Sequence, residues 1–141
     1  MSMFLKLGGS AVLAATLLTL PAGVTLAQNE GNDLDAITFT APQAIGGGAN
    51  YQRSCASCHG AQLEGFSAPA LSGPNFSWLE RPVSEFHAYI QDMMPADAPG
   101  TLSNAQVSTI IAFIAQNNGM EAGDTALPTD PAELESMRFG Q

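Results

Sequence analysis

The chain is poor in charge, and above all in positive charge. Only 12% of its 141 residues are charged, and four Lys and Arg stand against thirteen Asp and Glu. Lys6 is the only lysine, so Arg53, Arg81 and Arg138 are the only basic side chains in residues 28–141. Such a chain cannot neutralise a phosphate backbone, which excludes nucleic acid as a partner. Its acidity favours solubility and rapid encounter with a positively charged protein surface.

Cysteine is also scarce, and strand patterns are missing. The only two cysteines are Cys55 and Cys58. A single pair with one adjacent histidine lacks the second ligand cluster that a structural zinc site requires. The βαβ pattern that surrounds a thioredoxin-like redox dithiol is absent. The sequence shows no internal repeat and no alternating strand pattern, and its length predicts one small helical domain.

The N-terminus has the layout of a secretory signal peptide. Lys6 precedes an apolar run over residues 11–20, and small residues lead to Ala27. We therefore predict a signal peptide over residues 1–27, cleaved near Ala27, and a periplasmic location. The alternative is a retained membrane anchor, but the apolar run is shorter than the roughly 20 residues that a spanning helix needs. We expect no stable membrane span after cleavage.

Residues 55–59 read Cys-Ala-Ser-Cys-His. This C-x-x-C-H pattern is typical of a c-type haem attachment site. Cys55 and Cys58 can each form a thioether bond to a vinyl group of one haem, and His59 can bind the iron from the proximal side. The sequence therefore predicts one covalently bound haem c, whose attachment uses both cysteines.

A second axial ligand is expected, because electron transfer favours an iron whose coordination barely changes between redox states. Methionine opposite histidine also raises the potential. Met94 is the preferred candidate, because it lies at a predicted helix end directly before Pro95 and its side chain can turn inward. Met93 would face elsewhere. The alternative is that both methionines only fill the core. The candidates that remain after loss of the signal peptide are Met93, Met94, Met120 and Met137.

The first predicted helix runs from about Gly47 to Cys58. Gly47 and Tyr51 fall on one face of it. Glycine lowers helix stability, so its use there predicts the close approach of another helix. Residues 60–77 are rich in Gly, Pro, Ser and Ala and are predicted to form a loop. A loop of this length needs an organising scaffold, which a haem would supply.

The second predicted helix begins at the N-cap Ser84 and ends before Pro95. Its phase leaves His87 as a partly exposed surface imidazole rather than an alternative axial ligand. Its buried side is predicted from helical spacing to consist of Phe86, Ile90 and Met93.

The last long helix is predicted to begin at Ser103, where Gln106 completes a capping box. Asn118-Gly119 is a typical C-terminal stop. Further on, Asp130-Pro131 predicts the start of one short helix that continues through Met137.

These elements predict a simple domain organisation. The signal peptide (1–27) is followed by a flexible leader (28–43). The folded domain is expected over residues 44–119, and residues 120–141 form an acidic C-terminal extension.

Roughly residues 45–118 resemble the class I c-type cytochromes. The resemblance implies an all-α fold of three to five helices around one covalently attached haem. It also implies that Gly47 packs against Phe113, and that the carbonyl of Pro69 accepts the ring N–H of His59, with Pro74 a weaker candidate. The residues that carry the resemblance are Gly47, Tyr51, Cys55, Cys58, His59, Gly60, Pro69, Met94, Pro95, Ile110 and Phe113.

A narrower resemblance covers residues 94–103, 116–119 and 122–128. They look like cytochrome c domains that serve periplasmic quinoprotein alcohol dehydrogenases. In such domains the counterpart of Trp78 lines a haem edge or a propionate; the alternative for Trp78 is core packing. No pyrroloquinoline-binding domain is recognised, so only the role of electron acceptor carries over. The implied partners are redox proteins, with a quinoprotein dehydrogenase as donor and a terminal oxidase as final acceptor.

The sequence thus predicts a periplasmic monohaem electron carrier of the respiratory chain, without catalysis of its own. The alternative is a haem peroxidase or a gas-binding haem sensor with a labile sixth ligand. A peroxidase would need distal polar groups that assist O–O cleavage, and His87 is the only spare histidine.

Overall fold

The computed structural model describes residues 34–140. The predicted signal peptide (1–27) and the first part of the predicted leader lie outside the described residues. Among the residues that are described, no helix is long and apolar enough to cross a membrane. The elements are, in chain order, β1 (Asp35–Ala36), α1 (Ala41–Ser54), α2 (Ala56–His59), α3 (Val83–Met93), α4 (Asn104–Asn117), the 3₁₀ helix η1 (Pro131–Leu134) and β2 (Met137–Arg138).

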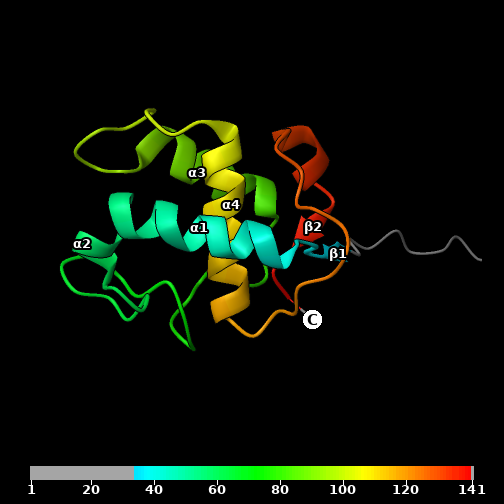
Figure 1. Ribbon diagram of the computed structural model, residues 1–141, viewed down its shortest axis with the longest axis horizontal. Helices are drawn as coiled ribbons and strands as arrows, with labels where there is room; N and C mark the ends of the chain where they lie inside the picture. The colour runs from blue at the N-terminus through cyan, green and yellow to red at the C-terminus, as the bar shows by residue number, and fades with distance from the viewer. Residues whose placement is uncertain (1–33, 141) are drawn as a thin grey trace, which may run out of the picture. The chain divides into compact units, whose positions relative to one another are not determined.

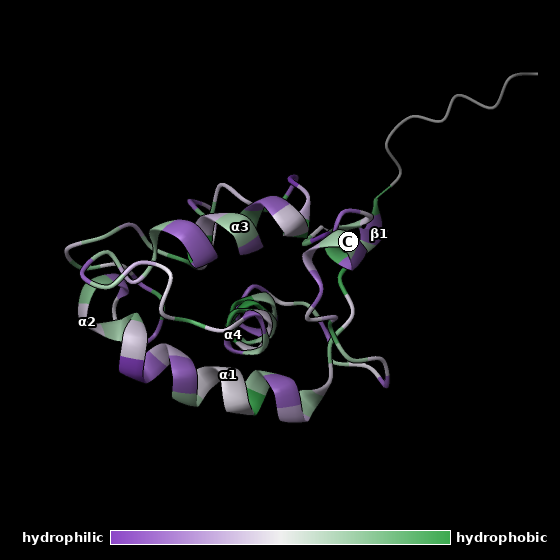
Figure 2. Ribbon diagram, turned by 90° about the horizontal axis from the view of Figure 1, so that it is seen from above, coloured by the Kyte–Doolittle hydropathy of each residue, from purple (hydrophilic) through white to green (hydrophobic). Residues whose placement is uncertain are grey.

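Helix α4 forms the centre of the fold, and the all-α class predicted from the sequence is confirmed. Figures 1 and 2 show α1 and α3 on either side of α4, which crosses between them. Burying a large aliphatic side chain contributes about 1.5–3 kcal/mol, so this helix dominates the core. Its buried aliphatic residues include Val107, Ile110, Ile111 and Ile114.

The contact between α1 and α4 depends on Gly47. A Cβ atom at this position would overlap the carbonyl oxygen of Thr109 and lie 3.0 Å from the Cβ of Phe113. One turn further on, the ring of Tyr51 lies 5.3 Å from that of Phe113, centroid to centroid. The predicted close approach at Gly47 is therefore present, and it explains why a glycine stands inside a helix.

Helix α1 begins earlier than the sequence indicated. Thr40 is its N-cap, and Thr40 and Gln43 form a reciprocal capping box. Pro42 lies in the first turn, where its missing N–H needs no partner. The helix ends at Ser54 and the short α2 follows, so the single predicted helix from Gly47 to Cys58 is wrong in its bounds. The three adjacent glycines concealed the helical character of this segment.

The segments before α1 and after α4 pack on the core. Strand β1 pairs in parallel with β2, which corrects the expectation of no strands. Phe39 is fully buried, so residues 34–43 are not a flexible leader. The predicted acidic C-terminal extension also packs on the domain, since it contributes buried apolar side chains to the same core. These are Leu127, Leu134 and Phe139.

The predicted ends of the later helices are largely correct. Ser103 and Gln106 form the expected capping box at the start of α4. Asn118 is its C-cap and Gly119 has a φ of +90°, a conformation that favours glycine. Helix η1 begins at Pro131 as predicted but ends at Leu134 instead of Met137.

Helix α3 differs from its prediction in its start and in its phase. Its N-cap is Pro82, not Ser84. Met93 is 54% exposed, whereas His87 is only 1% exposed. The reason is that α3 contacts α4 and, in addition, η1 and β2. Because α3 is packed on more than one side, its buried residues extend beyond a single apolar stripe and include His87, which helical spacing alone had assigned to solvent.

Candidate functional site

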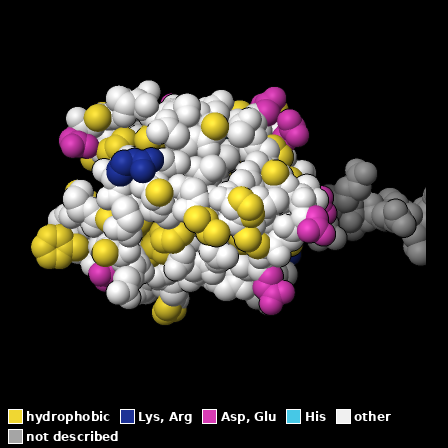
Figure 3. All heavy atoms as spheres, in the orientation of Figure 1, with side chains coloured by type: hydrophobic (Ala, Val, Ile, Leu, Met, Phe, Trp, Pro, Cys, Tyr) yellow, Lys and Arg dark blue, Asp and Glu magenta, His cyan; other side chains and the backbone are white. Residues whose placement is uncertain are grey.

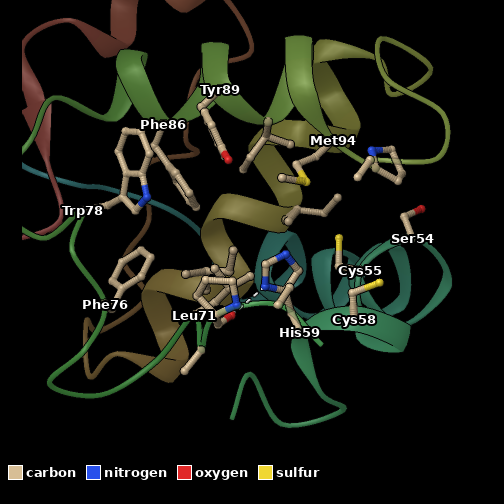
Figure 4. A pocket seen from close by; sticks show the side chains of 18 of the residues that line it. Ser54, Cys55, Cys58, His59, Leu71, Phe76, Trp78, Phe86, Tyr89 and Met94 are labelled. Carbon is tan, nitrogen blue, oxygen red and sulfur yellow. Dashed lines mark hydrogen bonds between the residues drawn. The ribbon is translucent and has the colours of Figure 1, made fainter. Parts of the chain in front are cut away.

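A cavity of about 640 Å³ opens between α2, the following loop, α3 and α4 (Figure 4). This volume lies in the range of pockets that bind small molecules and cofactors. Every site residue predicted from the sequence lines this cavity, although the residues are spread over four parts of the chain. They are Cys55, Cys58, His59, Pro69, Trp78 and Met94.

The imidazole of His59 is held by the loop that follows it. Its Nδ1 lies 2.7 Å from the carbonyl oxygen of Pro69, the hydrogen bond that the cytochrome resemblance implied. With Nδ1 as the donor, Nε2 keeps its lone pair available for a metal. Pro74, the weaker candidate, does not line the cavity.

The loop is itself fixed to the carboxyl end of α2. Gly65 N–H donates to the His59 carbonyl at 2.7 Å, and Ala68 N–H donates to the Cys58 carbonyl at 3.0 Å. These bonds satisfy carbonyl groups that a helix end leaves without partners. Gly65 has a φ of +83°, and a Cβ there would lie 2.8 Å from the backbone nitrogen of Ala70. The support of His59 is therefore built from local backbone bonds.

Met94 enters the cavity from the opposite side to His59 (Figure 4). It is the C-cap of α3, and its extended backbone (φ −126°, ψ 150°) is the conformation that a following proline favours. Its neighbour Met93 remains on the exposed side of the helix and does not line the cavity. The local turn thus separates two adjacent methionines.

The two thiols lie at one edge of the same cavity. Cys55 is half-buried and Cys58 is exposed, and they form no disulfide with each other. Burial, with a smaller effect from Cys58, raises the pKa of the Cys55 thiol to about 11. Redox dithiols instead have lowered pKa values that favour the thiolate. The surroundings of Cys55 thus differ from those of a reactive thiol in a redox dithiol.

Aromatic side chains form the wall remote from the cysteines. The ring centroid of Trp78 lies 5.0 Å from that of Phe86 and 5.4 Å from that of Tyr89. The guanidinium of Arg81 lies 4.1 Å above the Trp78 ring. Tyr89 and Phe76 also line the cavity, although they were not among the site residues predicted from the sequence. The three-residue spacing from Phe86 to Tyr89 could have revealed the former.

His87 is not among the residues that line the cavity. It is buried in the core, which corrects the prediction of a partly exposed imidazole. Burial lowers its pKa, and this effect is only partly offset by the backbone of Asn104.

The donor set and the lining fit a covalently attached haem. Two thiols stand beside an imidazole nitrogen, a thioether sulfur lies on the opposite side, and aliphatic side chains such as Ile110 and Ile114 line the space between. Together, the small helical fold and this site define a c-type cytochrome domain. Such a domain binds haem c covalently and transfers electrons.

The chain belongs to the family described as cytochrome c oxidase, cbb3-type, subunit III, whose model matches residues 42–114, just over half of the chain. Comparison with curated proteins and with solved structures gave no match. The matched range contains α2, α3, nearly all of α1 and most of α4. Strands β1 and β2 and helix η1 lie outside it.

Proposed function

We propose that the protein is a periplasmic monohaem cytochrome c whose iron is ligated by His59 and Met94. The observation that carries the proposal is the position of these two side chains on opposite sides of one apolar cavity, beside the paired cysteines. When bound, the haem supplies a one-electron redox centre.

The residues of the chain have separate tasks in this proposal. Cys55 and Cys58 tether the group, so it cannot dissociate. The carbonyl of Pro69 orients the His59 ring and raises its basicity. Met94 is a soft, neutral ligand, which favours the reduced state and so raises the potential.

The cavity wall excludes water from the redox centre. The apolar side chains of Leu71, Ile110 and Ile114 contribute to this lining. A low local dielectric favours the redox state with the smaller net charge, which also raises the potential. Trp78 lies in the same wall, where its indole N–H is a suitable donor to a propionate.

The proposed partners are redox proteins with positively charged docking surfaces. Figure 3 shows acidic side chains spread over one face of the described part, with few basic ones among them. The resemblance of residues 94–103 to cytochromes that serve quinoprotein alcohol dehydrogenases supports a dehydrogenase as the electron donor. The description of the matched family names an oxidase, which supports an acceptor in the respiratory chain.

Ligation of the iron by Met94 is tested by replacing Met94 and its neighbour Met93 separately. Met94→Ala should remove the sulfur-to-iron absorption band of the ferric protein and allow the ferrous protein to bind carbon monoxide. Met93→Ala is the matched control, because Met93 is exposed and lies outside the cavity; it should leave the spectrum unchanged. If the wild-type ferrous protein already binds carbon monoxide as readily as Met94→Ala, the carrier proposal fails and a gas sensor or peroxidase replaces it.

The location is tested on the exported protein. Expression with an intact haem maturation system should give a periplasmic product whose mass equals that of residues 28–141 plus one haem. A product that retains residues 1–27 in the membrane fraction would contradict the proposed cleavage near Ala27.

A further inference from the structure

The C-terminal segment, residues 120–140, supports the haem cavity from behind. Phe139 is fully buried but does not line the cavity. Its ring centroid lies 5.3 Å from that of Phe76 and 5.5 Å from that of Phe86, both in edge-on geometry. Phe76 and Phe86 lie 5.6 Å apart and both line the cavity. Phe139 therefore completes a three-ring cluster of which two rings form the wall.

The chain fixes Phe139 in place from two sides. The preceding residue, Arg138, belongs to β2, and its carbonyl accepts a hydrogen bond of 2.8 Å from Ile37 N–H. Its side chain donates from Nε to the Leu34 carbonyl at 3.1 Å. The backbone of Arg138 also forms an isolated antiparallel β-bridge with Pro82, the residue directly before α3. The backbone directly before Phe139 is thus anchored both to the N-terminal strand and to the start of α3.

This anchoring reaches Met94 through α3. Phe86 lies in the first half of the helix, and Met94 is its C-cap. The two residues are about 12 Å apart along the axis at 1.5 Å per residue. An α-helix moves as a rigid element over such a length, so a displacement at Phe86 also displaces Met94. The position of Phe86 in turn depends on the ring behind it, since packed cores do not deform without loss of contacts.

We propose that Phe139 is a positioning residue for the redox site: it holds Phe76, Phe86 and the start of α3 so that Met94 stays within reach of the iron. The proposal rests on the proposed ligation by His59 and Met94. It also assigns a role to a segment outside the range that matches the cytochrome family.

The test compares variants of the full-length haem-loaded protein. Phe139→Ala removes the ring, and Phe139→Leu keeps most of the volume while losing the edge-on contacts. The carbon monoxide affinity of the ferrous protein reports how often Met94 is detached, because apparent affinity scales with the competent fraction. Phe139→Ala should raise this affinity about tenfold or more. It should also lower the midpoint potential, with Phe139→Leu between it and wild type.

Leu127→Ala is the matched control. Leu127 is equally buried and lies in the same segment, but its backbone N–H bonds to Gln43 of α1 and it does not line the cavity. It should lower thermal stability without changing carbon monoxide affinity. If Phe139→Ala does not fold, Phe139→Leu decides by the same measurement.

Two results would overturn the proposal. One is a carbon monoxide affinity in the Phe139 variants that equals that of wild type. The other is a rise in carbon monoxide affinity in Leu127→Ala as large as that in Phe139→Ala, which would mean that any destabilisation of the core detaches Met94. A wild-type protein that binds carbon monoxide as readily as Met94→Ala rejects the ligation itself. A wild-type protein that resists carbon monoxide together with unchanged Phe139 variants rejects only the role of Phe139.

Discussion

At the scale of single residues, the site is organised by backbone groups close to the attachment motif. The carbonyl of Pro69 holds the ring of His59, and the bend before Pro95 turns Met94, but not Met93, into the cavity. The first effect uses an ordinary backbone carbonyl, and the second comes from the restriction that Pro95 places on the preceding residue. Small local features thus set the orientation of the two ligand candidates.

His87 leads to a prediction on acid stability. Burial lowers its pKa in the folded state below the ordinary value of 6.5. The unfolded chain therefore binds more protons below pH 6.5, so the stability contributed by neutral His87 is complete above that value and is lost as the pH falls. The loss can reach about 1.4 kcal/mol per pH unit while only the unfolded state is protonated.

Urea unfolding of wild type and His87→Phe at a series of pH values above and below 6.5 checks this. The variant should show a flatter dependence below pH 6.5. An identical slope in the two proteins would mean that His87 is not responsible for acid sensitivity.

At the scale of elements, the fold depends on how closely two helices approach. Gly47 allows the backbone of α1 to contact Thr109 of α4, and Tyr51 and Phe113 pack beside this point. The contact orients α1, whose end leads into the cysteine motif. The position of the cysteine motif, which would hold the haem, therefore depends on this helix crossing.

Neighbouring glycines of α1 give opposite predictions. Gly47→Ala should destabilise the protein by about 3 kcal/mol, because the added methyl group overlaps the Thr109 carbonyl and forces the helices apart. Gly46→Ala should stabilise it by about 0.5–1 kcal/mol, because a Cβ there meets nothing within 4 Å and alanine is the better helix former. Thermal unfolding of both variants checks the pair, and equal effects would contradict the assigned helix contact.

At the scale of the whole molecule, charge governs encounters with partners. Thirteen acidic residues and only three arginines lie in residues 28–141. Dissolved salt screens the attraction between oppositely charged partners. At physiological ionic strength the Debye length is about 8 Å, so the attraction between more distant charges is largely lost. Electrostatic steering raises association rates about 10- to 10³-fold.

Stopped-flow oxidation of the reduced protein by two probes tests this steering. The rate with a lysine-rich redox protein should fall by about tenfold or more as salt is raised, whereas the rate with the anion ferricyanide should rise. Salt dependences of the same sign for both probes would show that net charge does not control the encounter.

The motif residues and the main helices could be predicted because their signals are local. The spacing of Cys55, Cys58 and His59, the capping box at Ser103 and the stop at Asn118-Gly119 each involve residues a few positions apart. The bounds of α1 could not be predicted, because its three glycines are poor helix formers, and the contact of Gly47 and Gly48 with α4 becomes visible only in the tertiary structure.

The sequence by itself determined the attachment chemistry, the candidate axial ligands and the helical class, since these depend on neighbours along the chain. Only the tertiary structure decided that the C-terminal segment belongs to the core, that His87 is buried and that Phe139 backs the aromatic wall. The physical reason is that these features arise from contacts between residues far apart in the sequence. Burial of an apolar face depends on what covers it, and no periodicity identifies the covering segment.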